Sequence, residues 1–515
     1  MGKFVNRRDF LKFLGGGVVG TTLSPLPWKL LDDAAIWTQN WSWLPRLPRG
    51  EISVHYTHCT LCPAGCGLRV RCVGDEAFGL SGVRGHPISC GHLCPLGLAG
   101  HHLRYHPARL TSPQMRAGKG GPAALSRNEA VTQIAAWLAE ARATGGEGAV
   151  AVLDARPGRE LSLLYRRFLA ALGCGAYLVG PSQEASTTVL GEMLTEPYGP
   201  LGIDLEGVQT LLSFGAPVLD GWGAPGRIAH LIPGAMTRAP GGVFQSRDHH
   251  PLLIQIETRP SRTALRADQW LRIKPGTEAA LALSLGHVIV AERLYSEQFI
   301  AEKAIDFSAD GGPSYRRLIS HFTPERTAVI TGLPPDMIRE TARRFAEDRP
   351  AIAIPGVDPG GGSLGYEEEL AIWGLNLLVG NLGQKGGFLP RALEPAARQS
   401  DRPGGIEGLP LAPCRDVSQV PDRSIHLLIV DGPGSGCALP WAVVERKLAV
   451  GARVVNLSPF RAGSALRADL ILPAPASMER LEDVPAPFDS PVSSLGLSVP
   501  ILPAPAGTME PAELV

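Results

Sequence analysis

The sequence has no excess of charge of either sign, because 49 Lys and Arg residues balance 49 Asp and Glu residues. Nucleic-acid-binding domains usually carry a basic excess, so this balance argues against nucleic acid as a partner. It also gives no basis for electrostatic binding to a membrane. Beyond the N-terminal segment there is no run of about eighteen apolar residues, so no membrane-spanning helix is predicted there. No Cys-x-x-Cys pair precedes a His, which excludes a c-type haem.

Cysteine is scarce, with 9 in 515 residues, but its placement is uneven. Cys59, Cys62 and Cys66 stand at C-x2-C-x3-C spacing, and Cys94 follows in a separate segment. Three thiolates on one tight loop and a fourth from a second loop can surround a [4Fe–4S] cluster. A zinc site and a disulfide framework are the alternatives, although zinc favours paired C-x2-C motifs and thiols this close in sequence rarely bridge. Cys90 competes with Cys94 for the fourth position.

At 515 residues the chain is too long for one core and is predicted to form about three domains. The division that we expect is a signal and Trp/Pro-rich arm over 1–49, a cluster domain over 50–112, a discontinuous α/β domain over 113–178 and 346–490, a second α/β domain over 179–345, and a Pro-rich tail over 491–515 that ends without a folded element.

Strand and helix patterns alternate through the middle of the chain. This alternation predicts an α/β fold, with parallel sheets covered by helices on both faces. The predicted strands are 149–153, 209–214, 252–256, 351–354, 425–430, 453–457 and 470–472. The predicted helices are 159–172, 278–292, 334–347, 367–379 and 439–450. Glycine-rich turns follow three of the strands, but none is a G-x-G-x-x-G at the right offset, so alone they are a weak phosphate signal.

The N-terminal segment NRRDFLKFL, residues 6–14, is typical of a twin-arginine export signal. It predicts export as a folded protein and a place on the periplasmic side of the cytoplasmic membrane. The apolar stretch that follows is too short to span a bilayer comfortably. Residues 27–50 are rich in Trp and Pro and are predicted to be extended.

Several motifs together resemble one family. CTLCPAGCGLRV and LCPLGLAGHHLRYHPARLTSP resemble the opening of the molybdopterin (bis-pterin guanine dinucleotide) oxidoreductases, such as formate dehydrogenases and periplasmic nitrate reductases. TALRADQWLRIKPGTEAALALSLGHVIVAERLYSEQFI, GLNLLVGNLGQKGG and RADLILPAPASMERLEDV are similar to later segments of that family. The resemblance covers about residues 50–490. It implies the fold of that family, with an N-terminal [4Fe–4S] domain and two α/β domains, and it makes Cys94 the fourth cluster ligand.

The sequence also departs from the family pattern. The Lys or Arg that usually bridges cluster and pterin, two residues after the last cluster cysteine, is Leu96 here. The position of the molybdenum ligand aligns with Glu184. The Asn-Pro phosphate turns are replaced at 215–217 and at 432–433, and we expect the C-terminal cap domain of the family to be missing. Glu278 remains as a candidate guanine contact. These departures disfavour bis-pterin molybdenum, which Glu184 would ligate if it were present.

This combination is similar to the pterin-less subunits of quinone-linked respiratory complexes, namely alternative complex III and the menaquinone reductase complex. The resemblance implies an iron–sulfur electron-transfer and scaffold subunit. Its implied partners are a ferredoxin-like multi-cluster subunit, an integral membrane quinone-binding subunit and a multihaem cytochrome c. The alternatives are a catalytic molybdenum oxidoreductase subunit and a structural subunit whose cysteines hold nothing.

Overall fold

The computed structural model describes residues 6–24, 29–30, 50–117, 121–144, 146, 148–180, 190, 201–231, 251–304, 307, 314–356, 364–391, 411–432 and 439–515. The chain divides into two units, 1–52 and 53–515. In the first unit, α1 (Arg7–Leu23) begins at Asn6, whose side-chain oxygen accepts a 2.9 Å hydrogen bond from the backbone N–H of Asp9. None of the helices within the described ranges has both the length and the apolar character needed to cross a bilayer. Most of the predicted arm of 27–50 lies outside the described residues.

The cluster domain is built on a small three-stranded sheet with β2 in the centre. Its elements are β1 (Ile52–His58), β2 (Gly67–Val73), β3 (Glu76–Gly82), the short helix α3 (Pro95–Leu98) and the 3₁₀ helix η1 (Gly100–Tyr105). The loop that carries three of the predicted cluster cysteines joins β1 to β2. The segment with Cys94 enters α3 directly, so both cysteine segments are anchored at the ends of regular elements.

An eight-stranded sheet forms the first α/β domain. Its spatial order is β14 (Cys414–Asp416), β7 (Gly175–Val179), β6 (Val150–Asp154), β15 (Ile425–Asp431), β16 (Leu448–Asn456), β17 (Leu470–Ile471), β4 (Gln114–Ala117) and β5 (Gly121–Ala124). Neighbouring strands from β14 to β17 pair in parallel. Strand β4 pairs antiparallel with β17, and β5 pairs antiparallel with β4.

Both faces of this sheet are covered. Successive side chains of a strand point to opposite faces, and in a parallel sheet both sets of side chains are buried. Val150 and Val152 pack under α4 (Arg127–Ala143) and α5 (Glu160–Leu172). The intervening Ala151 and Leu153 pack on the opposite face. That face is covered by α16 (Trp441–Lys447), η4 (Val417–Gln419) and η5 (Gly463–Arg467).

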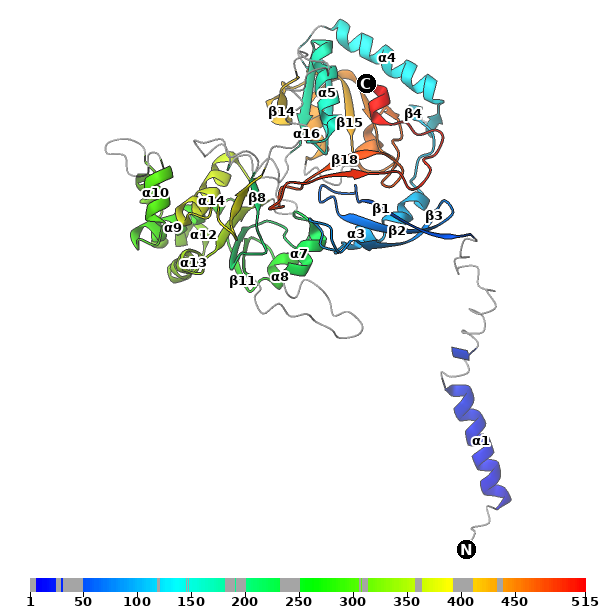
Figure 1. Ribbon diagram of the computed structural model, residues 1–515, viewed down its shortest axis with the longest axis horizontal. Coiled ribbons are helices and arrows are strands. Elements are labelled where there is room, and N and C mark those ends of the chain that lie inside the picture. Colours follow the sequence, from blue (N-terminus) through cyan, green and yellow to red (C-terminus); the bar gives the residue numbers. More distant parts are fainter. Residues whose placement is uncertain are drawn as a thin grey trace. The chain divides into compact units, whose positions relative to one another are not determined.

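A four-stranded parallel sheet forms the second α/β domain, which Figure 1 shows in green to yellow. Its order is β11 (Gln269–Arg272), β10 (Leu252–Glu257), β9 (Thr210–Phe214) and β12 (Ala351–Pro355). Its helices are α7 (Pro225–Leu231), α8 (Arg262–Arg266), α9 (Glu278–Ala291), α10 (Glu297–Lys303), α11 (Tyr315–Ile319), α12 (Pro324–Thr331), α13 (Pro335–Glu347) and α14 (Tyr366–Val379). A small antiparallel pair, β8 (Leu201–Ile203) with β13 (Phe388–Pro390), lies beside it.

The predicted domain boundary at 345/346 is not where the sheets divide. Residues 351–355 pair in parallel with β9, with Ala351 opposite Thr210, and not with the strands of 425–472. Asn376 of α14 locks this arrangement, because its amide accepts from the N–H of Ala353 and donates to the carbonyl of Ala353, both at 2.8 Å. The segment 351–390 therefore belongs with the second α/β domain. Helix α16 is also shorter than predicted, because β16 begins at Leu448.

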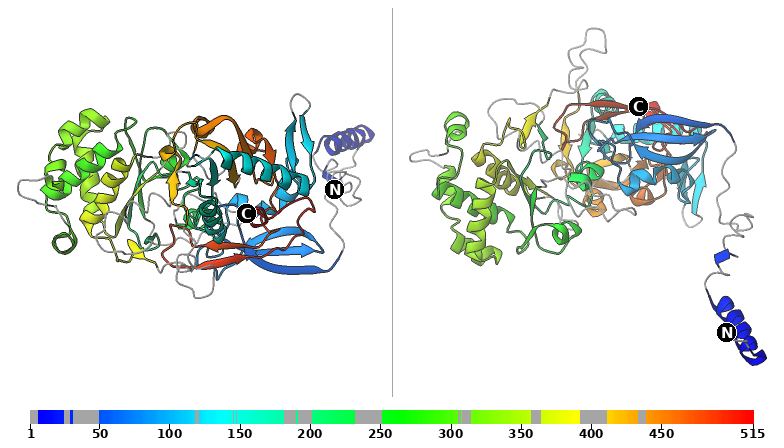
Figure 2. Two further views of the ribbon diagram at one scale, coloured as in Figure 1. Left: turned by 90° about the horizontal axis from the view of Figure 1, so that it is seen from above. Right: turned by 60° about the horizontal axis from the view of Figure 1, so that its bottom comes forward.

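The expectation that the Pro-rich tail ends without a folded element was wrong. The chain forms an antiparallel hairpin of β18 (Glu482–Pro485) and β19 (Leu495–Ser498), and it ends in α17 (Pro511–Leu514). Figures 1 and 2 show this red-orange hairpin alongside the blue strands of the cluster domain. Thr57 of β1 exchanges hydrogen bonds of 2.9 and 3.0 Å with the backbone of Val499. The hairpin thereby joins the cluster domain to the eight-stranded sheet.

Candidate functional site

The first cysteine loop is closed on itself. The N–H of Cys59 donates a 2.8 Å hydrogen bond to the carbonyl of Cys66. The side chains of these two cysteines are buried, and Cys62 between them is half-buried. Gly65 adopts φ +57°, and a Cβ there would lie 2.4 Å from a methyl carbon of Val484 in β18. A glycine is therefore needed at Gly65, both for the left-handed backbone and for the close packing of the C-terminal hairpin.

Cys94 comes to the same place from the second segment. It caps α3, and its Sγ accepts a hydrogen bond from the N–H of Gly97 at 3.3 Å. Helix α7 of the second α/β domain backs onto it, because a Cβ on Gly226 would lie 3.1 Å from the backbone nitrogen of Cys94. Cys94 lies near enough to contribute to the raised pKa of Cys59 and of Cys66, whereas Cys90 is exposed on the surface. The structure thus brings Cys94, the predicted fourth ligand, to the first loop.

The electrostatics of the loop suit thiolates that are held by a cation. Burial, together with the neighbouring Cys62 and Cys94, raises the pKa of Cys59 to about 12. Burial and the other three cysteines likewise raise the pKa of Cys66. Thiols that destabilise each other's charge in this way become thiolates when metal coordination neutralises them.

The chemistry of the four thiols suits an iron–sulfur cluster. Within the described residues, no group of three or more His, Cys, Asp or Glu side chains is arranged to hold a single metal ion. A [4Fe–4S] cluster spreads its four thiolates around a larger body. Backbone N–H groups also point at the sulfurs, and Cys62 receives one from Ala64. The residues present therefore fit the cluster that the spacing predicts.

A second feature lies at the carboxyl edge of the eight-stranded sheet. β6 and β15 are neighbours, but the chain leaves β6 through α5 towards β7 and leaves β15 through α16 towards β16, on the other side. Where connections diverge in this way, a crevice opens beyond the strand ends, and open α/β sheets bind their ligands there. Asp154 and Asp431, the last residues of the two strands, are paired directly across the ladder. Both are buried.

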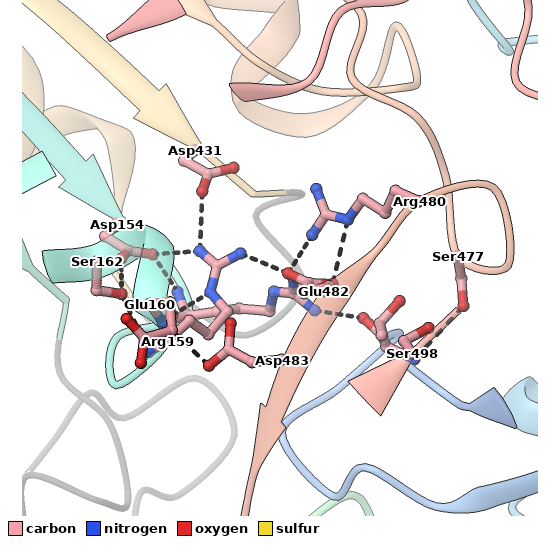
Figure 3. Close-up of polar contacts among 12 residues, drawn as sticks. Asp154, Arg159, Glu160, Ser162, Asp431, Ser477, Arg480, Glu482, Asp483 and Ser498 are labelled. Atoms are coloured by element: carbon pink, nitrogen blue, oxygen red, sulfur yellow. Dashed lines mark hydrogen bonds and ion pairs between the residues drawn. The ribbon is translucent and has the colours of Figure 1, made fainter. Parts of the chain in front are cut away.

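The described residues at this edge form a buried ion cluster centred on Arg159. The Arg159 guanidinium donates to Asp154 at 2.9 Å, to Asp431 at 2.8 Å and to Glu482 at 2.6 Å (Figure 3). Glu482 belongs to β18 and is shared with Arg156 and Arg480. We call the six residues Asp154, Arg156, Arg159, Asp431, Arg480 and Glu482 the switch-point cluster.

The ionised state of the switch-point cluster is maintained by its own charges. Burial opposes ionisation of Glu482, but Arg480, Arg156 and Arg159 outweigh it and lower the pKa of Glu482 to about 2. Burial likewise opposes ionisation of Asp431, but the nearby Arg159 outweighs burial and lowers the pKa of Asp431 below its usual range. The carboxylates and guanidiniums thus satisfy each other inside the protein.

The corresponding edge of the four-stranded sheet is also closed by protein atoms. A Cβ on Gly356, which follows β12, would lie 2.1 Å from the Cα of Ala216 in the turn after β9. Gln255 donates to the carbonyl of Ala216 at 3.2 Å and to the buried carboxylate of Glu257 at 2.9 Å. Glu257 also accepts from the N–H of Ser261 at 2.9 Å.

Of the remaining predicted residues, the structure describes Leu96 and Glu278. Leu96 is 51% exposed on α3. Glu278 is the first residue of α9 and is half-buried. Glu184, the predicted equivalent of the molybdenum ligand, lies outside the described residues.

Comparison with known proteins decides the family. Residues 52–106 match the Molybdopterin oxidoreductase Fe4S4 domain. The chain is 30% identical over 511 residues to the menaquinone reductase, molybdopterin-binding-like subunit of Nitratidesulfovibrio vulgaris, covering 99% of this chain and 70% of that protein. The chain belongs to the molybdopterin oxidoreductase family. It is also 24% identical over 391 residues to the thiosulfate reductase molybdopterin-containing subunit PhsA of Salmonella typhimurium, which covers 75% of this chain but only 47% of that protein.

The fold agrees with this family. Acetylene hydratase from Pelobacter acetylenicus superimposes with a TM-score of 0.65 at 17% sequence identity, covering 89% of this chain and 68% of that one. The predicted α/β architecture with an N-terminal Fe4S4 domain is therefore confirmed. Within the described residues, the carboxyl ends of β6 and β15 are occupied by Arg159 and its carboxylate partners. An anionic ligand would have to displace Arg159 and then face the unpaired carboxylates of Asp154 and Asp431.

Sequence reasoning missed the switch-point cluster. The available signal was an Asp at the end of each of two buried strands, in AVLD and LLIVD. Two arginines in ARPGRE and the acidic run in MERLEDV complete the set. Each charge by itself is typical of an exposed loop, so only the pairing of β6 with β15 reveals that they meet.

Proposed function

We propose that this chain is an iron–sulfur electron-transfer and scaffold subunit of a periplasm-facing, membrane-associated respiratory quinone oxidoreductase complex, and that it works without molybdenum. Cys59, Cys62, Cys66 and Cys94 hold one [4Fe–4S] cluster. Such a cluster supplies a one-electron carrier. No acid or base of this chain is assigned to substrate chemistry.

The observation that carries this proposal is the closed crevice. Arg159 fills the space at the β6–β15 switch point and is neutralised by three buried carboxylates. Breaking such a group of charges costs several kcal/mol, so an incoming dinucleotide would have to offset that cost before it gained any contact. The exposed Leu96 also supports a subunit without molybdenum, because its side chain offers no cation between a cluster and a second cofactor.

The quinone complex is proposed from two further observations. The relative in Nitratidesulfovibrio vulgaris is named as a subunit of a menaquinone reductase. The twin-arginine pattern at Arg7 and Arg8 is the basis for proposing the periplasmic side. The proposed partners are a ferredoxin-like multi-cluster subunit, an integral membrane quinone-binding subunit and a multihaem cytochrome c.

The test is metal analysis of the complex purified with this chain tagged, from cells supplied with molybdate and tungstate. The proposal expects iron assigned to this chain and an electron paramagnetic resonance signal that is lost in the Cys59→Ser variant, without molybdenum or tungsten. Stoichiometric molybdenum with pterin would favour a catalytic subunit ligated at Glu184. A chain without iron would favour the purely structural alternative.

A further inference from the structure

We propose that Arg156 holds the first cysteine loop in place and sets the reduction potential of its cluster, supplying from the eight-stranded sheet the cation that α3 lacks at Leu96. This inference rests on the proposed [4Fe–4S] cluster and assigns to Arg156 a role that the cysteine motif does not contain. Arg156 is a positioning residue, since it acts through the loop and not as a ligand.

The geometry of Arg156 is fixed on three sides. It lies in the turn between β6 and α5, where its backbone N–H donates to Asp154 at 2.8 Å. Its Nη1 donates a 2.6 Å hydrogen bond to the carbonyl oxygen of Thr60, and its Nη2 is paired with Glu482. The side chain is only 16% exposed. Because its other contacts already restrict the Arg156 side chain, the hydrogen bond to the loop costs little additional side-chain entropy.

Thr60 makes this contact relevant to the cluster. It follows Cys59 and lies two residues before Cys62, so its carbonyl is part of the loop that would wrap the iron. Its N–H is directed to the hydroxyl of Ser477 at 3.4 Å. Within the switch-point cluster, Arg156 is thus the member that reaches the cysteine loop.

Arg156 shares its carboxylate counter-ion with two other arginines. Glu482 is its carboxylate partner, but Glu482 also pairs with Arg159 and Arg480. Asp154 and Asp431 are engaged by Arg159. Glu482 is paired with Nη2 of Arg156, whereas Nη1 donates to the carbonyl of Thr60, so the guanidinium presents its positive charge to the loop through Nη1.

The effect on the cluster has a definite sign. A [4Fe–4S] cluster with four thiolates is anionic and becomes more so when it accepts an electron. A buried cation nearby stabilises the reduced form more than the oxidised form, because charge interactions are strong where water is excluded. Arg156 therefore raises the reduction potential of the cluster, and its removal lowers it.

The experiment is a potentiometric titration of the cluster, followed by electron paramagnetic resonance, in the purified complex. We compare wild type with Arg156→Gln, Arg156→Lys and Arg480→Gln. Arg480→Gln is the matched control, since the Arg480 side chain is 11% exposed and also pairs with Glu482, but it is not the residue bonded to Thr60. For Arg156→Gln we expect the ratio of reduced to oxidised cluster at a fixed potential to fall about tenfold, which is 59 mV for one electron.

The other variants separate charge from structure. Arg156→Lys should keep a potential near that of wild type, and Arg480→Gln should lower the melting temperature while leaving the potential in place. An unchanged potential in an iron-replete Arg156→Gln protein, or an equal shift in Arg480→Gln, would overturn the inference. If Arg156→Gln fails to retain iron, Arg156→Lys decides: a wild-type potential supports the inference, and a lowered one contradicts it. Wild-type protein without iron would instead refute the proposed function.

Discussion

Arg159 and Asp431 lie 272 positions apart in the sequence, yet Nη2 of Arg159 is 2.8 Å from Oδ2 of Asp431 in the interior of the protein. Arg159 precedes the first residue of α5, and Asp431 is the last residue of β15. Their ion pair therefore crosses the mouth of the crevice between β6 and β15. The place where an open α/β sheet usually receives a ligand is here occupied by the protein itself.

Replacing Arg159 should destabilise the protein strongly. Arg159→Met removes the cation and leaves the carboxylates of Asp154, Asp431 and Glu482 partly uncompensated in the interior. Removing one partner of a buried ion pair typically costs about 3–5 kcal/mol. Urea denaturation of the purified chain measures the change.

The matched control is Arg343→Met. Arg343 makes a two-pronged ion pair with Glu292, but its side chain is 49% exposed. Solvent screening keeps such pairs to about 1 kcal/mol or less. Equal losses in the two variants would contradict a structural role for the switch-point cluster.

Stability should fall in acid through the same residues. The pKa of Glu482 is depressed from 4.5 to about 2, so its contribution is fully present above its unfolded value and is lost as the pH falls from there towards 2. Asp431 contributes in the same direction. Denaturation midpoints measured from neutral to acid pH should show a shallower decline in Glu482→Gln than in wild type. Asp336→Asn, at a side chain that is 98% exposed, should leave the slope as it is; parallel slopes in wild type and Glu482→Gln would contradict the assignment.

The two cysteines that compete for the fourth ligand position should behave differently. Cys94→Ser removes the sulfur that caps α3 near the first loop, so we expect loss of most of the bound iron and of the reduced-state paramagnetic signal. Cys90→Ser changes an exposed thiol and should keep both. Iron content per chain measures the difference, and the reverse pattern would move the ligand to Cys90.

The contact between α7 and the Cys94 segment should be sensitive to one added methyl group. In Gly226→Ala the Cβ would lie 3.0–3.1 Å from backbone atoms of His92, Leu93 and Cys94, which cannot rotate away as a side chain would. We expect about 1–3 kcal/mol of destabilisation. We also expect slower reconstitution of the cluster, because the methyl group displaces a ligand-bearing segment. Gly85→Ala is the control, since a Cβ there has open space around it. Equal stability and equal reconstitution rates in the two variants would show that the close packing of α7 against the Cys94 segment does not constrain that segment.

Local patterns predicted much of this fold, because local chemistry decides it. The apolar periodicity of 159–172 and 278–292 predicted α5 and α9 within a residue at each end. The cysteine spacing predicted the first loop, which the hydrogen bond from Cys59 to Cys66 closes. Each of these signals lies within about fifteen neighbouring residues.

What failed depends on distant partners. The apolar strand AIAIP, residues 351–355, could by its composition join either parallel sheet. Only the three-dimensional structure shows that it pairs with β9. The proline content around β18 and β19 concealed a hairpin. The hairpin is held to the cluster domain by the hydrogen bond of Thr57 with Val499 and by the close approach of Val484 to Gly65. Asp154, Asp431 and Glu482 resemble ordinary polar loop residues until the sheet brings them to Arg159.

The most direct test of the account is an experimental density map of the purified complex at the carboxyl ends of β6 and β15. The account predicts continuous side-chain density for Arg159 between Asp154 and Asp431, with Glu482 against its other edge. Density for a pterin dinucleotide in that crevice, with Arg159 displaced and a heavy atom beside it, would contradict it.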